Sequence, residues 1–344
     1  MSAARQGWQN FLPRANAGRE RAEAEYNLAQ IPYRAGNWNE ALTSLQDYLR
    51  RTAVTGDTAQ YRVQAQYNIA LAYRNLNNTQ QYRRALREVV TVFRASGQQP
   101  GSVAAAWAAE ALFRDLDDQV TEFRRNTFSQ GDAAALRAQL DRFKVQLRAI
   151  DEAARQVVQL RGGEYSIGAL VRQGQAHEHL ATQERRIGDL LQLSRDQQAR
   201  ITQAQRAIQQ LRTAAEQLRR AGRDAQADQL EQRASDTEQQ LEDQRTQATQ
   251  QVQATFDQEA DAETQLAIIN YGTAIHTARS NNIPTPFATE ALRSLRSEDN
   301  QRLVEPALTQ QRVFEYRPGM FDGEASGAVL PQSSPVVSSG LATE

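Results

Sequence analysis

The chain contains no proline between Pro100 and Pro284, and this long gap is the strongest constraint on its fold. Proline breaks a helix because it lacks a backbone N–H and its ring clashes with the preceding turn. Glycine, which also disfavours helices, is sparse over the same stretch. The alternation of β-branched and aromatic residues that marks strands is missing throughout. The sequence therefore predicts an all-α protein.

The N-terminal part repeats a pattern of two helices joined by a short polar break. The first copy comprises Tyr26–Ala29 and Gly36–Leu42, and the second comprises Tyr67–Tyr73 and Gln81–Leu86. A helix pair of this kind cannot bury its own apolar face, so copies stack on one another and leave a groove for partners. The pattern predicts a binding scaffold.

The two copies resemble the tetratricopeptide repeat (TPR), whose fold is an array of helical hairpins. The resemblance covers residues 21–95 and fades after Ala95. Pro32 departs from the repeat pattern and predicts a local kink in the first helix. Small residues at the matching positions let helices approach closely, and large residues fill the space between them. The matching positions are Leu28, Ala29, Gly36, Trp38, Ala41, Leu45 and Tyr48 in the first copy and Gln66, Ile69, Ala70, Tyr73, Tyr82 and Ala85 in the second.

The resemblance implies a partner-binding groove formed by the inner positions of the repeats. These positions correspond to Tyr26, Gln30, Arg34, Tyr67 and Arg74. Tyrosine and arginine are enriched among the residues that contribute most to protein–protein binding. An alternative stays open, in which Tyr26 and Tyr67 only pack between repeats. The expected partners are other proteins or peptides.

Changes of pattern along the chain predict six segments. A helix at Val103–Arg114 closes the repeats, and apolar residues at steps of three and four predict a long helix over 132–160. Gly162-Gly163 then breaks the chain before a further helix. The predicted segments are a lead-in at 1–20, TPR-like helical repeats at 21–114, a long helical hairpin at 115–183, a coiled-coil hairpin at 184–260, closing helices at 261–317 and a flexible tail at 318–344.

The segment 184–260 contains two heptad seams that differ in register. The register changes at Ala221–Asp224, where glycine followed by aspartate predicts a turn between two helices. We expect an antiparallel coiled-coil hairpin, and one continuous helix with a stutter is the alternative. The first seam contains Leu190, Ser194, Gln197, Ile201, Ala204, Ile208, Leu211, Ala215 and Leu218, and the second contains Ala227, Leu230, Ala234, Thr237 and Leu241.

Two further phrases, Gly163–His179 and Asn270–Arg279, are similar to segments of large repeat proteins of myxobacteria and their relatives. Some of those proteins are linked with adventurous gliding motility and work at the cell envelope. They usually carry an export signal and further N-terminal repeats, and neither occurs in this sequence, so the resemblance implies a fragment or a misplaced start. The expected location is the cytoplasm if the N terminus is genuine, and the periplasm or cell envelope if the start is truncated.

Charge and composition exclude several classes of partner. The formal net charge is −1 at pH 7, so no overall field draws the chain to nucleic acid or to anionic lipid. No stretch has the uncharged apolar length of a transmembrane helix, and we expect no membrane insertion. The chain has no cysteine, which excludes disulfides and cysteine-ligated metals. Aromatic residues make up only 7 %, and this favours a thin helical body over a large globular core.

Two clusters of titratable residues are candidates for a metal site or for acid–base catalysis. His177 and His179 are two positions apart, so on a helix they point in different directions and cannot share a metal ion without help. We expect them to be ordinary surface or packing histidines. Asp115, Asp117 and Asp118 lie at a predicted helix end, and a solvated turn explains them. The sequence therefore predicts no catalytic residue, no metal, no cofactor and no enzyme. The expected function is a scaffold or adaptor in a multiprotein assembly, and the alternative is a coiled-coil structural protein that forms a homo-oligomer.

Overall fold

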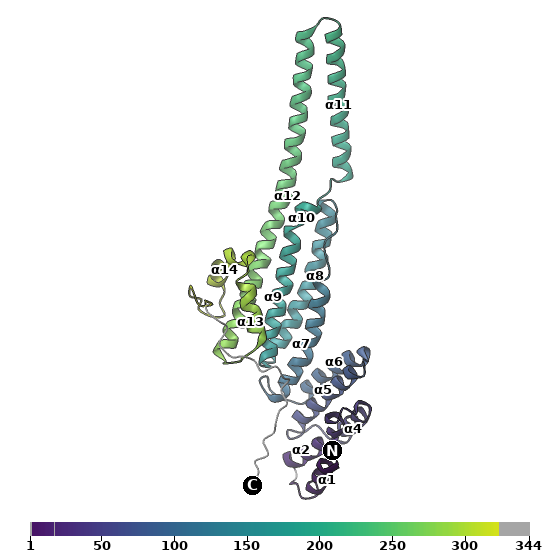
Figure 1. Ribbon diagram of the computed structural model, residues 1–344, viewed down its shortest axis with the longest axis vertical. Helices are drawn as coiled ribbons and strands as arrows, with labels where there is room; N and C mark the ends of the chain where they lie inside the picture. The colour runs from purple at the N-terminus through teal and green to yellow at the C-terminus, as the bar shows by residue number, and fades with distance from the viewer. Residues whose placement is uncertain (1, 17, 323–344) are drawn as a thin grey trace. The chain divides into compact units, whose positions relative to one another are not determined.

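The computed structural model describes residues 2–16 and 18–322, and these residues fold almost entirely into α-helices (Figure 1). They contain no strand, and their only β-type pairing is an isolated bridge between Gly131 and Leu191. The predicted all-α fold is confirmed. The helices of the described residues are α1 (Ser2–Phe11), α2 (Arg19–Ala29), α3 (Ile31–Arg34), α4 (Trp38–Arg51), α5 (Ala59–Asn75), α6 (Thr79–Ala95), α7 (Val103–Phe123), α8 (Ala133–Gln159), α9 (Glu164–Arg185), α10 (Ile187–Leu190), α11 (Arg195–Arg220), α12 (Asp224–Ser280), α13 (Pro286–Leu295) and α14 (Glu298–Gln310).

The chain forms two compact units, each built from more than one stretch of sequence. Unit 1 consists of Met1–Asp115, Ala154–Val171 and Ile268–Glu344. Unit 2 consists of Leu116–Ala153 and Arg172–Ala267. Helices α7, α8, α9 and α12 contribute residues to both units. The contacts that hold each unit together therefore join residues far apart in the sequence.

The first helices of unit 1 pack around a cluster of tyrosines. Tyr26 of α2 stacks on Tyr61 of α5, with ring centroids 5.5 Å apart. The edge of Tyr48 from α4 meets Tyr26 at 5.9 Å. Aromatic pairs of this geometry add stability beyond the area that they bury. Small buried residues on the neighbouring helices allow this close packing, and they include Ala22, Ala41, Ala70 and Ala85.

The first predicted helix is interrupted close to Pro32, as expected. Helix α2 ends at Ala29, and the short α3 begins at Ile31 with Pro32 in its first turn. Proline has no N–H to donate to the preceding turn, so it is tolerated at a helix start and not inside a continuous helix.

The connection between α8 and α9 depends on the small size of Gly162. A Cβ atom at this position would lie 2.1 Å from the Cβ of Ala109 on α7. The backbone N–H of Gly162 donates to Ser166 Oγ over 2.9 Å. The chain therefore turns here with its backbone against α7, and the predicted break between the two helices is present.

Helix α8 buries the apolar stripe that the sequence predicts. Every member of the stripe is at most 8 % exposed. Since the positions recur at steps of four and three, they lie on one side of the helix and face its neighbours. The buried stripe residues are Leu136, Leu140, Phe143, Leu147, Ile150, Ala154 and Val157.

The prediction that Asp115, Asp117 and Asp118 form a solvated turn at a helix end is wrong. Helix α7 continues through them to Phe123. The physical reason is that its apolar stripe also continues, with Leu116 fully buried, while the aspartates occupy the other side of the helix. Asp117 accepts a hydrogen bond from Arg172 of α9 within unit 2.

Helix α12 runs without interruption from Asp224 to Ser280. The predicted boundary between the coiled-coil hairpin at 184–260 and the closing helices at 261–317 therefore falls inside one helix. The chain offers no proline or glycine that would end a helix between Gly222 and Gly272. The predicted closing helices also contain α14, which has Pro306 inside it.

The first heptad seam begins later than predicted. Leu190 belongs to the short α10, and Ser194 is the N-cap of α11. Ser194 Oγ accepts from the backbone N–H of Gln197, and the Gln197 side chain accepts from the N–H of Ser194. This reciprocal pair is a capping box, which starts a helix at the position after the serine.

The predicted tail at 318–344 is only partly described. Phe321 is buried, and its carbonyl accepts from Arg296 over 2.8 Å, so the start of this segment packs on unit 1. The rest of the tail, residues 323–344, lies outside the described residues. Of the helices described, none has the length and apolar character to cross a membrane.

Candidate functional sites

The structure separates the five predicted groove residues into two groups. Tyr26, Gln30 and Tyr67 are only 2 %, 4 % and 5 % exposed, whereas Arg34 and Arg74 lie on the surface. The burial of Tyr26 and Tyr67 fits the alternative in which these two residues pack between repeats. A binding role for the five residues stays a prediction.

The buried tyrosines keep polar partners for their hydroxyl groups. Asn68 Nδ2 donates to Tyr26 Oη over 2.9 Å, and Arg114 Nε donates to Tyr67 Oη over 3.3 Å. A buried polar group without a partner is costly, so these contacts explain how both tyrosines enter the core. Burial raises the pKa of Tyr26 and of Tyr67, which keeps both hydroxyls neutral.

An open groove of about 510 Å³ lies between α1, α2 and α4 of unit 1. Leu12, Leu28 and Ala29 form its apolar part. At its edge Arg5 of α1 pairs with Glu40 of α4 over 3.1 Å, and both side chains are about half exposed. The remaining lining residues are polar or charged and comprise Gln9, Glu25, Thr43, Ser44, Asp47, Tyr48, Arg51 and Thr52. The groove therefore offers apolar contact together with charges of both signs.

Helices α11 and α12 of unit 2 are joined by a turn at the position where the sequence predicts one (Figure 1). Gly222 has a φ of 72°, the left-handed conformation that glycine adopts most readily. Arg219 of α11 pairs with both Asp228 and Glu231 of α12 over 2.9 Å. Whether the seams form a regular coiled coil stays a prediction. The seam residues that are fully buried are Ile208, Ala215, Ala227 and Ala234.

The same two helices border a cleft of about 340 Å³ at the end of the hairpin away from the turn. Seam positions Ile201 and Leu241 line it and are only half buried. Arg200 and Arg245 stand among the lining side chains, which include no acidic residue. The remaining lining residues are Ala133, Leu191, Gln192, Leu193, Gln197, Gln244, Ala248, Thr249 and Val252.

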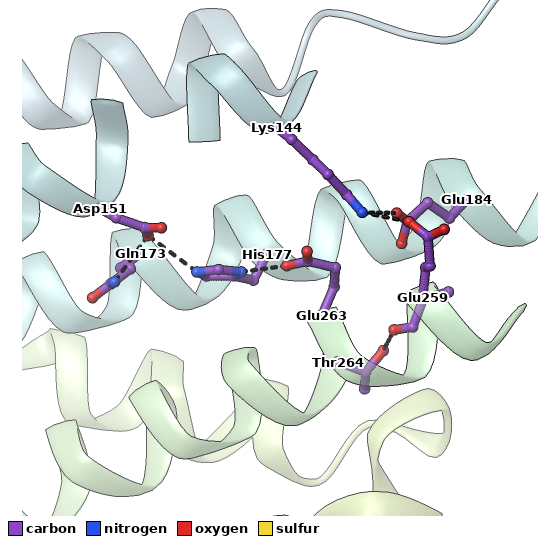
Figure 2. A network of polar contacts seen from close by, with 9 residues as sticks. Lys144, Asp151, Gln173, His177, Glu184, Glu259, Glu263 and Thr264 are labelled. Carbon is purple, nitrogen blue, oxygen red and sulfur yellow. Dashed lines mark hydrogen bonds and ion pairs between the residues drawn. The ribbon is translucent and has the colours of Figure 1, made fainter. Parts of the chain in front are cut away.

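A buried polar network joins α8, α9 and α12 inside unit 2 (Figure 2). At one end His177 of α9 lies between two carboxylates. Its Nδ1 is 2.6 Å from Glu263 Oε2, and its Nε2 is 3.1 Å from Asp151 Oδ1. Burial alone lowers the pKa of His177, but the hydrogen bonds to Asp151 and Glu263 outweigh it and raise the pKa to about 9. At neutral pH the imidazole is therefore a cation that donates from both nitrogens.

At the other end of the network Glu184 of α9 is completely buried. Neither of its carboxylate oxygens has a hydrogen-bond partner among the described residues. Lys144, the only lysine of the chain, places Nζ 3.9 Å from Glu184 Oε1 and makes a closer ion pair with Glu259. Burial raises the pKa of Glu184 to about 8, with a further contribution from Glu263 and opposition from Lys144. The carboxyl is therefore mostly protonated at neutral pH.

The sequence predicts an ordinary surface or packing histidine at position 177. It does not reveal this network, because the residues of the network come from three distant segments. A signal was nevertheless present. Each of the three helices repeats charged or titratable residues at a spacing of four or seven, which places them on one side of the helix. The pairs are Lys144 and Asp151 on α8, His177 and Glu184 on α9, and Glu259 and Glu263 on α12.

The network consists of ion pairs made by His177 and Lys144 and of the protons that His177 and Glu184 hold at neutral pH. Within the part of the chain that the structure describes, no group of three or more His, Cys, Asp or Glu side chains is arranged to hold a metal ion. The other histidine of α9, His179, donates from Nε2 to the carbonyl of Asn126 over 2.9 Å and takes no part in the network. The network thus ties three helices together through His177, Lys144 and their carboxylate partners.

No family model matches this sequence, and no curated protein and no solved structure matches it either. The resemblance of residues 21–95 to the tetratricopeptide repeat therefore stays a prediction, as does the similarity to the myxobacterial repeat proteins.

Proposed function

We propose that this chain is a non-enzymatic scaffold that binds other proteins or peptides in a multiprotein assembly at the cell envelope. The open groove between α1, α2 and α4 is the observation that carries this proposal. Its volume of about 510 Å³ lies in the usual range for ligand sites, about 300–1,000 Å³. The TPR resemblance supports the same function, and the envelope location rests on the myxobacterial resemblance alone.

The groove favours a peptide segment as the ligand. Leu12, Leu28 and Ala29 accept an apolar side chain, and the surrounding carboxylates and arginines accept polar groups on either side of it. Mixed surfaces with an apolar centre and a polar rim are typical of protein–protein contacts. The rim pair Arg5–Glu40 is solvent-exposed, so a partner can replace it at little cost.

The proposal is tested by filling the groove. Thr43 is exposed and lines the groove on α4, and Thr43→Arg places a long charged side chain in it. Thr91 on α6 is a matched control, because it is also exposed and its hydroxyl makes the same bond to the carbonyl four residues earlier. Crosslinking in cells followed by mass spectrometry should recover a partner with the wild type and with Thr91→Arg that is lost with Thr43→Arg. Recovery of the same partners by the two variants would contradict the proposal, and so would the absence of any partner for the wild type and both variants.

The cleft beside the hairpin favours a second candidate function, self-association. Ile201 and Leu241 are seam positions, yet they are only half buried and border a cleft. A helix from a second copy can cover such an open seam and bury its apolar side chains. In this function the chain is a structural protein that forms a homo-oligomer.

Sedimentation over a range of concentrations distinguishes the two functions. Self-association predicts a sedimentation coefficient that rises with concentration in the wild type and in the control Gln240→Asp, whose side chain is exposed beside Leu241. Leu241→Asp should abolish the rise, because it puts a charge into the apolar seam. A wild type that stays a monomer throughout would exclude self-association and leave the scaffold function.

A further inference from the structure

We propose that Glu184 is a proton-binding site that couples the packing of α9 against α8 and α12 to pH. The neutral carboxylic acid keeps the three helices together, and loss of its proton loosens them. The proposal concerns unit 2 alone and does not depend on the scaffold function.

The environment of the Glu184 carboxyl group disfavours its ionised form. The Glu184 side chain is 0 % exposed, so water does not solvate it. None of the described groups donates a hydrogen bond to either oxygen. An ionised carboxylate in such a place loses its hydration and gains no hydrogen bond in return, whereas the neutral acid is tolerated far better.

The cations on α8 already form ion pairs with another carboxylate. Lys144 and Arg137 both form ion pairs with Glu259 of α12. The separation of 3.9 Å between Lys144 Nζ and Glu184 Oε1 is longer than a hydrogen bond. An ionised Glu184 therefore has to compete with Glu259 for the same two cations.

The charges on α9 and α12 also disfavour an ionised Glu184. Glu263 of α12 is a second carboxylate that acts on Glu184. It forms an ion pair with His177, which lies on the same helix as Glu184. His177 also contacts Asp151 of α8, so its positive charge is shared between two acids. The surroundings therefore have no spare positive charge, and ionised Glu184 would add one unmatched negative charge to the core.

These contacts set the direction of the pH response. The surroundings raise the pKa of Glu184 to about 8, above its value in an unfolded chain. Stability from a raised carboxyl pKa is fully present below the unfolded value and is lost as pH rises through the folded value. On ionisation Lys144 is drawn toward Glu184 and away from Glu259, which weakens the link between α8 and α12.

The test is hydrogen exchange of the α9 segment 172–185 at pH 6 and pH 9, corrected for the intrinsic effect of pH. We expect exchange in the wild type to increase at least about tenfold between the two pH values, a change that ionisation of one strongly shifted carboxyl suffices to produce. Glu184→Gln has the shape of the neutral acid, so its exchange should rise clearly less than that of the wild type, and the rise that remains comes from His177, whose pKa is about 9. Glu216→Gln, an exposed substitution on α11, is the matched control and should behave as the wild type.

Equal pH responses in Glu184→Gln and the wild type would overturn the proposal. A second measurement uses the wild type only and does not depend on how the variant folds. In nuclear magnetic resonance of protein labelled with ¹³C at the glutamate carboxyls, a resonance should titrate near pH 8. If all glutamates titrate below pH 6, the proposal is wrong.

Discussion

Replacing His177 by glutamine removes one positive charge from the interior of unit 2 and leaves its two acidic partners in place. Glutamine approximates the size of the imidazole and keeps hydrogen-bonding capacity, so it creates little cavity. Asp151 and Glu263 are then two mostly buried carboxylates, 24 % and 14 % exposed, without their shared cation. Removing one partner of a buried ion pair typically costs about 3–5 kcal/mol, because the remaining charge is left unmatched.

The pKa of His177 gives an independent magnitude. It is raised from 6.5 to about 9, and a tenfold change in proton affinity corresponds to about 1.4 kcal/mol. Protonated His177 therefore contributes about 3 kcal/mol to stability near pH 6. Because the folded pKa lies above the unfolded one, this contribution is complete below about pH 6.5 and is lost as pH rises through 9. The substitution should cost about 3 kcal/mol at pH 6 and very little at pH 10.

Urea unfolding followed by circular dichroism at pH 6, 8 and 10 measures this cost. The matched control is His179→Gln, two positions along the same helix. Burial lowers the pKa of His179, so its neutral form is favoured and its contribution falls as the pH is lowered, opposite in sign to that of His177. A cost for His177→Gln below about 1 kcal/mol at pH 6 would refute the reasoning, and so would a cost that does not change with pH.

Two further predictions concern a close contact and the hairpin turn. Gly162→Ala should destabilise unit 1 by about 1–3 kcal/mol in thermal unfolding, since its Cβ would clash with Ala109, whereas Gly56→Ala, which has open space, should have little effect. Equal effects of the two substitutions would contradict the close contact. Spin labels at Gln209 and Gln239 should lie within about 20 Å of each other in a dipolar coupling measurement, because an uninterrupted helix at 1.5 Å per residue would hold them about 45 Å apart. The longer distance would exclude the turn at Gly222.

Local features of this chain could be predicted from the sequence, because they depend on neighbours along the chain. The buried stripe of α8 follows from its spacing, and the turn at Gly222 follows from the change of register and the glycine itself. The three aspartates at 115, 117 and 118 predict a solvated helix end, yet α7 continues to Phe123. Leu116 and Phe123 continue the buried stripe past them, and this outweighs the aspartates.

The site residues depend on partners that the sequence does not place. The sequence around Tyr26 and Tyr67 does not show whether these side chains face a groove or the core. Their burial depends on Asn68 and Arg114, which supply the hydrogen bonds to the two hydroxyl groups. His177 looked like a packing residue because its two acids come from other helices. Spacing on one helix shows which residues share a side, and only the packing of helices shows which sides meet.

The two units should respond differently to alkaline pH, because they bury different kinds of group. The core of unit 1 relies on tyrosines such as Tyr26 and Tyr67. Burial raises the pKa of both side chains above the ordinary value of 10, so they stay neutral through pH 9. Unit 2 relies on His177 and Glu184, whose pKa values of about 9 and about 8 lie within the range where protons are lost. Both groups favour the folded state when protonated, so their losses add as pH rises. Loosening between pH 7 and 9 should therefore be confined to unit 2, while the groove of unit 1 keeps its shape and its capacity to bind.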